Sequence, residues 1–174
     1  MTINELRIQL DLQPENRIDI LNDLNVARKC DEEYLFVDSN DGHCYLFDRN
    51  GNEDDVKKIK NIKNYAFLQC KSLKSIVIPD SVKSIGHGAF YECESLTSII
   101  IPDLVESIEY YAFAWCESLK SIVIPDSVKS IGTIAFYECE NLKSVTFKGK
   151  TIDKVKSMDN YPFGIKDESI IKCC

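Results

Sequence analysis

The sequence repeats itself every 23 residues, and four cysteines mark the period: Cys70, Cys93, Cys116 and Cys139. Around them the same apolar grid recurs, and its clearest copy reads Val82, Ile85, Ala89, Phe90, Cys93, Leu96, Ile99, Ile101 and Pro102. A fixed period of this length is typical of stacked structural units, because each unit is too small to bury its apolar face alone. The sequence therefore predicts a solenoid, and it directs the search for function toward surfaces rather than catalysis.

Each copy contains two short extended segments and one tight turn. The stretch Ser-Leu-Lys-Ser-Ile-Val-Ile-Pro has the alternation and β-branched content of a strand, which its proline ends because proline cannot donate to a continuing ladder. These prolines are Pro79, Pro102 and Pro125. The stretch Val-Lys-Ser-Ile-Gly predicts a second short strand. The Ala-Phe-x-x-Cys segment predicts a tight helical turn that directs its phenylalanine inward.

The phenylalanines of the four copies are predicted to form one buried stack with the leucine and cysteine columns. This stack comprises Phe67, Phe90, Phe113 and Phe136. The cysteines are predicted to be reduced and metal-free, because stacked coils place them in a line about 4.8 Å apart, whereas a zinc site needs converging thiolates. The chain ends in Cys173 and Cys174. Cys173 is expected to pack on the last coil, and the alternative is that this pair exposes a reactive thiol.

The repeats occupy residues 59–150 as four copies, and residues 151–174 are predicted to form a truncated fifth copy and a C-terminal cap. The truncated copy consists of Val155, Met158, Pro162 and Phe163, followed by a closing strand at Ser169–Lys172. Terminal copies of a solenoid are expected to be atypical, since the stack must stop there.

Residues 1–58 do not share the repeat, and they carry 14 acidic and 7 basic side chains, which accounts for the whole net charge of −7. We expect a strand at Arg7–Leu12, a helix over Glu15–Lys29 and a hairpin whose strands flank residues 38–42. The segment is predicted to be an N-terminal cap that shields the first coil, with an independent small domain as the alternative.

The repeating motif, L-x-x-I-x-I-P-x-x-V-x-x-I-x-x-x-A-F-x-x-C, resembles the BspA-like (treponemal-type) leucine-rich repeat family. The resemblance covers roughly residues 59–164. It implies a leucine-rich-repeat solenoid of the α/β class, a right-handed superhelix of mostly short parallel strands with short helical turns. It also implies a concave parallel sheet and a role in binding proteins or glycans at microbial or protist surfaces. The family shares no catalytic residues.

Several classes of function are disfavoured by composition. An acidic chain without a dense Lys/Arg face is a poor nucleic-acid binder, and no segment approaches the roughly 20 apolar residues of a membrane helix. No secretory signal is visible, which favours the cytoplasm, with the cell surface by a non-classical route as the alternative. No cofactor is expected. His43 is expected to be a turn residue and His87 to be exposed, and the Asp- and Asn-rich turns do not fit a calcium loop.

The outward positions of the first strand in each copy are the candidate partner-binding residues, because repeat proteins use such concave faces. They form three columns: Lys74, Thr97, Lys120 and Lys143; Ser75, Ser98, Ser121 and Ser144; and Val77, Ile100, Val123 and Thr146. β-branched residues also suit a sheet for structural reasons alone, which is the competing explanation for the third column.

The leading hypothesis is therefore a non-enzymatic, monomeric interaction module that binds a protein through this face, with a glycan as the alternative ligand. A second hypothesis is an adhesin-like protein of a microbial or protist surface that binds a host or matrix protein or a glycan. A hypothesis of another class is an enzyme whose chemistry lies in residues 1–58.

Overall fold

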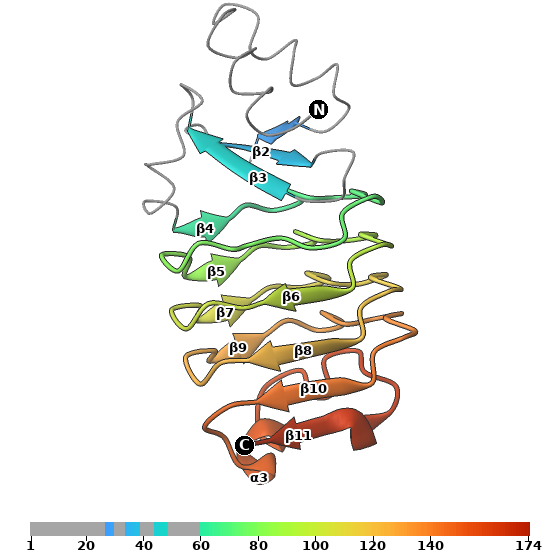
Figure 1. Cartoon of the computed structure of the whole chain (residues 1–174). Coiled ribbons are helices and arrows are strands. Elements are labelled where there is room, and N and C mark those ends of the chain that lie inside the picture. The colour runs from blue at the N-terminus through green and yellow to red at the C-terminus, as the bar shows by residue number, and fades with distance from the viewer. Residues whose placement is uncertain (1–26, 30–33, 39–43, 49–59) are drawn as a thin grey trace, which may run out of the picture.

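The structure is a computed structural model that describes residues 27–29, 34–38, 44–48 and 60–174, with side chains in the last range only (Figure 1). The strand predicted at Arg7–Leu12, the helix before Ala27 and His43 lie outside the described residues. Within the described part, no helix is long and apolar enough to cross a membrane.

Three strands before the repeats form an antiparallel sheet in the order β1-β2-β3: β1 (Ala27–Lys29), β2 (Tyr34–Asp38) and β3 (Cys44–Asp48). The pairing of Tyr34 with Asp48 confirms the predicted hairpin. The predicted helix is wrong at its C-terminal end, because Ala27 pairs with Val37 and backbone pairing there overrides the helical pattern. Figure 1 shows β2 and β3 at the N-terminal end of the stack, next to β4.

The repeats form a parallel solenoid of about five coils, whose strands lie in two four-stranded sheets. The first sheet has the order β4-β5-β7-β9, with β4 (Asn61–Ile62), β5 (Ser84–Ile85), β7 (Ser107–Ile108) and β9 (Ser130–Ile131). The second has the order β11-β10-β8-β6, with β6 (Ser98–Ile100), β8 (Ser121–Ile124), β10 (Ser144–Phe147) and β11 (Ile171–Cys173). Equivalent residues pair from coil to coil, as Ser98 does with Ser121, so the sequence period sets the register.

The Ala-Phe-x-x-Cys segment is a run of β-turns rather than the predicted helical turn. Alternate N–H groups bond within the turn, as from Cys70 to the carbonyl of Phe67 at 3.1 Å, and across to the next coil, as from Phe67 to Ala89 at 2.7 Å. A helix would keep both bonds within one segment. Each turn also contains two residues with positive φ, such as Tyr65 and Gln69, which interrupt a helix.

The core confirms the predicted columns. Neighbouring rings of Phe67, Phe90, Phe113 and Phe136 lie nearly parallel, with centroids 4.9, 5.2 and 5.6 Å apart. All four rings are at most 1% exposed. Each coil therefore covers the apolar face of the coil before it, which is how units this small remain folded.

The C-terminal end departs from the regular coil. It contains a short helix, α3 (Ile152–Lys156), which Thr151 caps, and a 3-10 helix, η3 (Glu168–Ile170), before β11. Of the residues assigned to the fifth copy, Val155 and Phe163 are buried, and the Phe163 carbonyl accepts a bond from the Phe136 N–H at 3.0 Å. The division of the chain into four copies, a truncated fifth copy and a cap stays a prediction. The closing strand begins later than predicted, since Ser169 and Ile170 belong to η3.

Candidate partner-binding face

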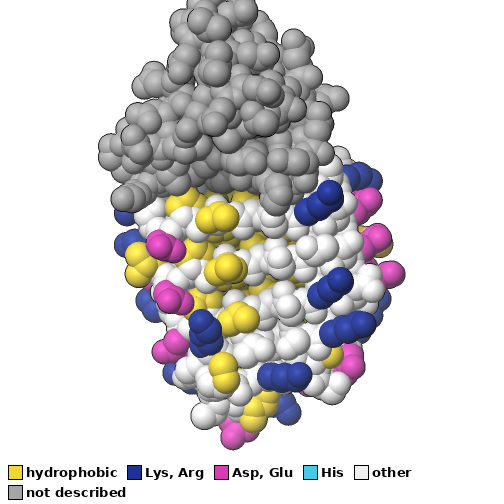
Figure 2. Space-filling view, in the orientation of Figure 1, with side chains coloured by type: hydrophobic (Ala, Val, Ile, Leu, Met, Phe, Trp, Pro, Cys, Tyr) yellow, Lys and Arg dark blue, Asp and Glu magenta, His cyan; other side chains and the backbone are white. Residues whose placement is uncertain are grey.

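An aliphatic column runs down the outer face of the sheet β6–β8–β10–β11. Val77 pairs with Ile100, and Ile100 with Val123; these side chains are 84%, 81% and 41% exposed. They point outward because side chains alternate along a strand and the residue before each, such as Ile99, is buried. Figure 2 shows hydrophobic side chains forming a column on this face, with Lys and Arg side chains to one side. We refer to Val77, Ile100 and Val123 as the aliphatic column.

A lysine column lies on one side of the aliphatic column, at the start of the strands. It consists of Lys74, Thr97, Lys120 and Lys143, all exposed. The backbone N–H of each later member donates to the carbonyl of the member before it, at 3.1, 3.3 and 2.9 Å in turn. The backbone ladder therefore holds three lysines at fixed heights along the stack.

A serine column lies between the lysine and aliphatic columns. Ser98 and Ser121 are exposed, whereas Ser75 and Ser144 are half-buried, and the hydroxyls of Ser144 and Thr146 are 3.4 Å apart. All the residues predicted for the partner-binding face are thus exposed or half-buried and belong to one sheet face. Their role in binding stays a prediction.

Two features of this face were not predicted. Beyond Thr146, the predicted fourth member of the third column, the column continues into Lys172, which pairs with Thr146 in β11 and is exposed. The opposite border carries an aspartate column, which follows the prolines that end the strands: Asp80, Asp103 and Asp126, all exposed. The aspartates were visible as a recurring Pro-Asp pair. Lys172 was hidden by irregular spacing, since 26 residues rather than 23 separate it from Thr146.

The last aspartate is held by a buried lysine. Lys150 is 8% exposed, and its Nζ donates to the Asp126 carbonyl at 2.6 Å and to Asp126 Oδ1 at 3.1 Å. Hydrogen bonds from a charged group are stronger than those between neutral groups, so this pair links Lys150, at the end of the fourth copy, to the aspartate column.

A second surface, on the turn side of the coils, is aromatic and was missed. Its exposed members are Tyr65, Tyr110, Trp115 and Tyr137, between 36% and 50% exposed. His87 is half-buried rather than exposed as predicted, because its ring lies between Tyr65 and Tyr110 at centroid distances of 4.9 and 5.2 Å. Trp115 and Tyr137 meet edge to face at 6.1 Å. The aromatic rings cover one another, whereas the aliphatic column has its outer side open. The sequence feature that could have indicated this aromatic surface is the aromatic content of the variable repeat positions.

The cysteine ladder stabilises the turns. The thiols of Cys93, Cys116 and Cys139 donate to the carbonyls of Phe67, Phe90 and Phe113 in the preceding coil, each at 3.1 Å. The four ladder cysteines carry thiols rather than disulfides, and burial raises the pKa of the Cys116 thiol well above its ordinary value. A protonated thiol is neither a nucleophile nor a metal ligand. No cluster of His, Cys, Asp or Glu suited to a metal lies within residues 60–174.

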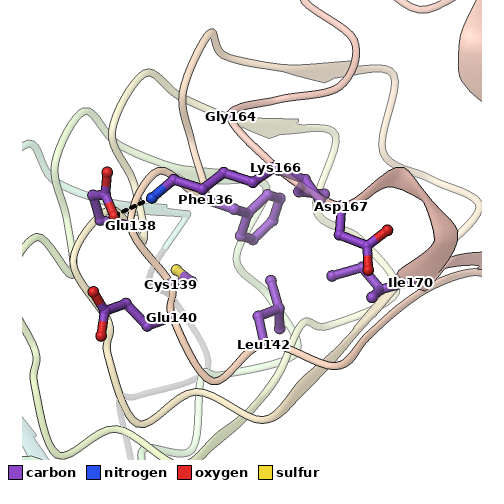
Figure 3. A pocket seen from close by; sticks show the side chains of 10 residues that line it. Phe136, Glu138, Cys139, Glu140, Leu142, Gly164, Lys166, Asp167 and Ile170 are labelled. Carbon is purple, nitrogen blue, oxygen red and sulfur yellow. Dashed lines mark hydrogen bonds and ion pairs between the residues drawn. The ribbon is translucent and has the colours of Figure 1, made fainter.

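A cavity of about 130 Å³ lies where the fourth coil meets the truncated fifth (Figure 3). Its apolar lining includes Phe136, Leu142 and Ile170, and at its edge Lys166 donates to Glu138 at 2.5 Å, which lowers the pKa of Glu138. Cys139 also lines it, and burial raises the pKa of this thiol to about 12. The cavity therefore offers no activated nucleophile.

Comparison with known proteins bears directly on the repeats. A family model described as "BspA type Leucine rich repeat region (6 copies)" matches residues 57–166. The chain belongs to the BspA-type leucine-rich repeat family. The matching model describes a repeat region and no enzyme.

Two solved structures are similar to this BspA-type chain. A leucine-rich repeat protein of T. pallidum is 38% identical with a TM-score of 0.50, over 51% of this chain and 41% of that one. A leucine-rich repeat protein of Bacteroides ovatus is 36% identical with a TM-score of 0.57, over 66% of this chain and 28% of that one. The match thus spans less than half of either relative. No match is found among curated proteins.

Proposed function

We propose that this chain is a non-enzymatic interaction module that binds a protein partner through the outer face of the sheet β6–β8–β10–β11. The observation that carries the proposal is the exposure of the aliphatic column, with Val77 and Ile100 more than four-fifths exposed. Contiguous exposed apolar surface rimmed by polar residues is typical of protein-binding sites. Here lysines and aspartates supply the rim.

The dimensions of the face suit a small interface. Coils about 4.8 Å apart make a five-coil face roughly 20–25 Å long, which is compatible with a standard interface of about 800 Å² per partner. A protein partner is favoured over a glycan because the centre of the face is aliphatic and its charged groups lie at the borders. Interfaces between proteins share this arrangement of apolar core and polar rim.

The test is capture of partners by the wild type and by a variant with Val77→Asp, Ile100→Asp and Val123→Asp. We expect the exposed column to tolerate these changes, and thermal unfolding of the variant checks this. A Val77→Ser, Ile100→Ser and Val123→Ser variant repeats the test without added charge. The matched control is Lys60→Gln, Lys83→Gln and Lys129→Gln, which changes the net charge equally at exposed positions before the strands of the other sheet.

We expect the wild type and the control to capture the same proteins, and both aliphatic-column variants to lose them. Retention of the same proteins by the column variants would contradict the proposed site. Loss of a captured glycan, with no protein affected, would replace the protein partner with a glycan.

A further inference from the structure

The spacing of the aliphatic column restricts what kind of segment can lie along it. Adjacent coils are about 4.8 Å apart, so the three side chains span about 10 Å along the stack. The buried phenylalanine rings repeat from coil to coil at a similar interval, with centroids 4.9 to 5.6 Å apart. A segment that lies along the stack and meets all three must present an apolar side chain at nearly this interval.

Of the regular conformations, the α-helix fits this interval best. One helical turn rises about 5.4 Å, so side chains on one face of two successive turns span about 11 Å. An extended strand presents same-face side chains about 6.7 Å apart and would span about 13 Å. A polyproline helix repeats about every 9.3 Å and would span about 19 Å.

The borders of the face fit the flanks of such a helix. Lys74 and Asp80 each lie three residues from Val77 along the chain, which is about 10 Å for an extended segment. A helix with its side chains is about 10–12 Å wide, so it fits between the lysine and aspartate columns. Lys172 ends the apolar part of the face, which limits the contact to about two helical turns.

We propose that the partner segment bound by this face is an amphipathic α-helix that lies along the stack. It has an aliphatic ridge at positions i, i+4 and i+7, acidic side chains on the flank over the lysine column, and basic side chains on the flank over the aspartate column. This inference rests on the proposed function and adds the conformation and charge pattern of the partner.

Two displayed peptide libraries of equal length test the inference against the full chain. One is randomised on one face of a stable helical scaffold, and the other consists of extended peptides whose prolines prevent helix formation. Binders count as face-dependent if they are lost with the Val77→Asp, Ile100→Asp and Val123→Asp variant and kept with the Lys60→Gln, Lys83→Gln and Lys129→Gln control.

We expect face-dependent binders at least tenfold more often from the helical library, with acidic residues enriched on one flank. Selection against a Lys74→Glu, Lys120→Glu and Lys143→Glu variant should reverse that flank to basic residues. The inference would be overturned if face-dependent binders came mainly from the extended library or if neither library yielded any. It would also be overturned if the flank stayed acidic in selection against the Lys→Glu variant. The proposed function fails separately, if natural partners are captured equally by the aliphatic-column variants.

Discussion

The two sheets of the solenoid share one architecture but differ in the residues they turn outward. In the sheet β4–β5–β7–β9 every strand has two residues, and the outward ones are Asn61, Ser84, Ser107 and Ser130. Two of these polar side chains are hydrogen-bonded to each other, since Ser84 Oγ donates to Asn61 Oδ1 at 2.7 Å. In the sheet β6–β8–β10–β11 the outward residues include Val77 and Ile100, which are more than four-fifths exposed.

This difference addresses the competing explanation that β-branched residues lie outward merely because they suit a sheet. The first sheet stacks in the same register with serine outward, so parallel stacking in this molecule does not require outward aliphatic residues. Stability comes from the inward columns, which both sheets share. The contrast between the two sheets therefore supports the proposed binding role of the aliphatic column.

The largest expected effect tests whether the inward columns carry the stability. Phe113→Ala should lower the free energy of unfolding by roughly 3–5 kcal/mol, because the rings on both sides prevent collapse of the cavity. Chemical denaturation measures the loss. Tyr137→Ala, at a 37% exposed ring, is the control and should cost about 1 kcal/mol or less. Similar losses for both variants would contradict the assignment of Phe113 to the core.

A second prediction compares two cysteines that make the same hydrogen bond at different burial. Cys116→Ala should cost about 1–2 kcal/mol, since it removes a fully buried sulfur and its bond to Phe90. Cys139→Ala should cost less, because Cys139 is only partly buried and borders the cavity. Urea denaturation of both variants checks the order, and a larger loss at Cys139 would be evidence against this account of the ladder.

The burial of the Cys116 thiol also predicts that the stability of the fold depends on pH. Its pKa is raised in the folded protein by burial, so its stabilising effect is complete below the ordinary thiol value near 9 and is lost as the pH rises above that value. The advantage of the wild type over Cys116→Ala should therefore shrink by up to roughly 1.4 kcal/mol per pH unit in that range. An advantage that stays constant from pH 8 to pH 10 would show that this thiol is not shielded from solvent.

The smallest effect on stability is expected when the outward residues of the two sheets are exchanged. Val77→Ser, Ile100→Ser and Val123→Ser should each change stability by only about 0.5 kcal/mol, as should Ser107→Val and Ser130→Val in the other sheet. Only the first set should abolish partner capture. If the Val→Ser changes destabilise the fold as a core substitution does, the aliphatic column is structural and the contrast between the sheets fails.

The sequence predicted the core better than any other part of the fold. A fixed period places equivalent residues directly above one another, so the apolar grid named the phenylalanine and cysteine columns, and Leu73 and Leu96 are fully buried. The turn was mispredicted because its positive-φ positions are mostly occupied by residues other than glycine, such as Tyr111 and Ile134. In the turns of the four full copies, which the structure describes, Gly88 is the one glycine at such a position, so the sequence shows the backbone requirement there alone.

The candidate face was predicted only where the period holds. The lysine, serine and aliphatic columns follow directly from the 23-residue register. Lys172 could not be placed, because the inserted residues before β11 break the count, and the half-burial of His87 depends on rings from two neighbouring coils. The prediction of helix at Ala27–Lys29 was wrong because these residues pair with β2, and a local sequence pattern does not reveal a non-local contact.

The most direct test of the binding claim is site-specific photocrosslinking at one position in each sheet. A photoreactive phenylalanine analogue replaces Ile100 in β6, or Ser130 in β9 as the matched exposed position, and the intact chain is irradiated with its captured partner. The account predicts a crosslink to the partner from position 100 and none from position 130. A crosslink from position 130 with none from position 100 would contradict it.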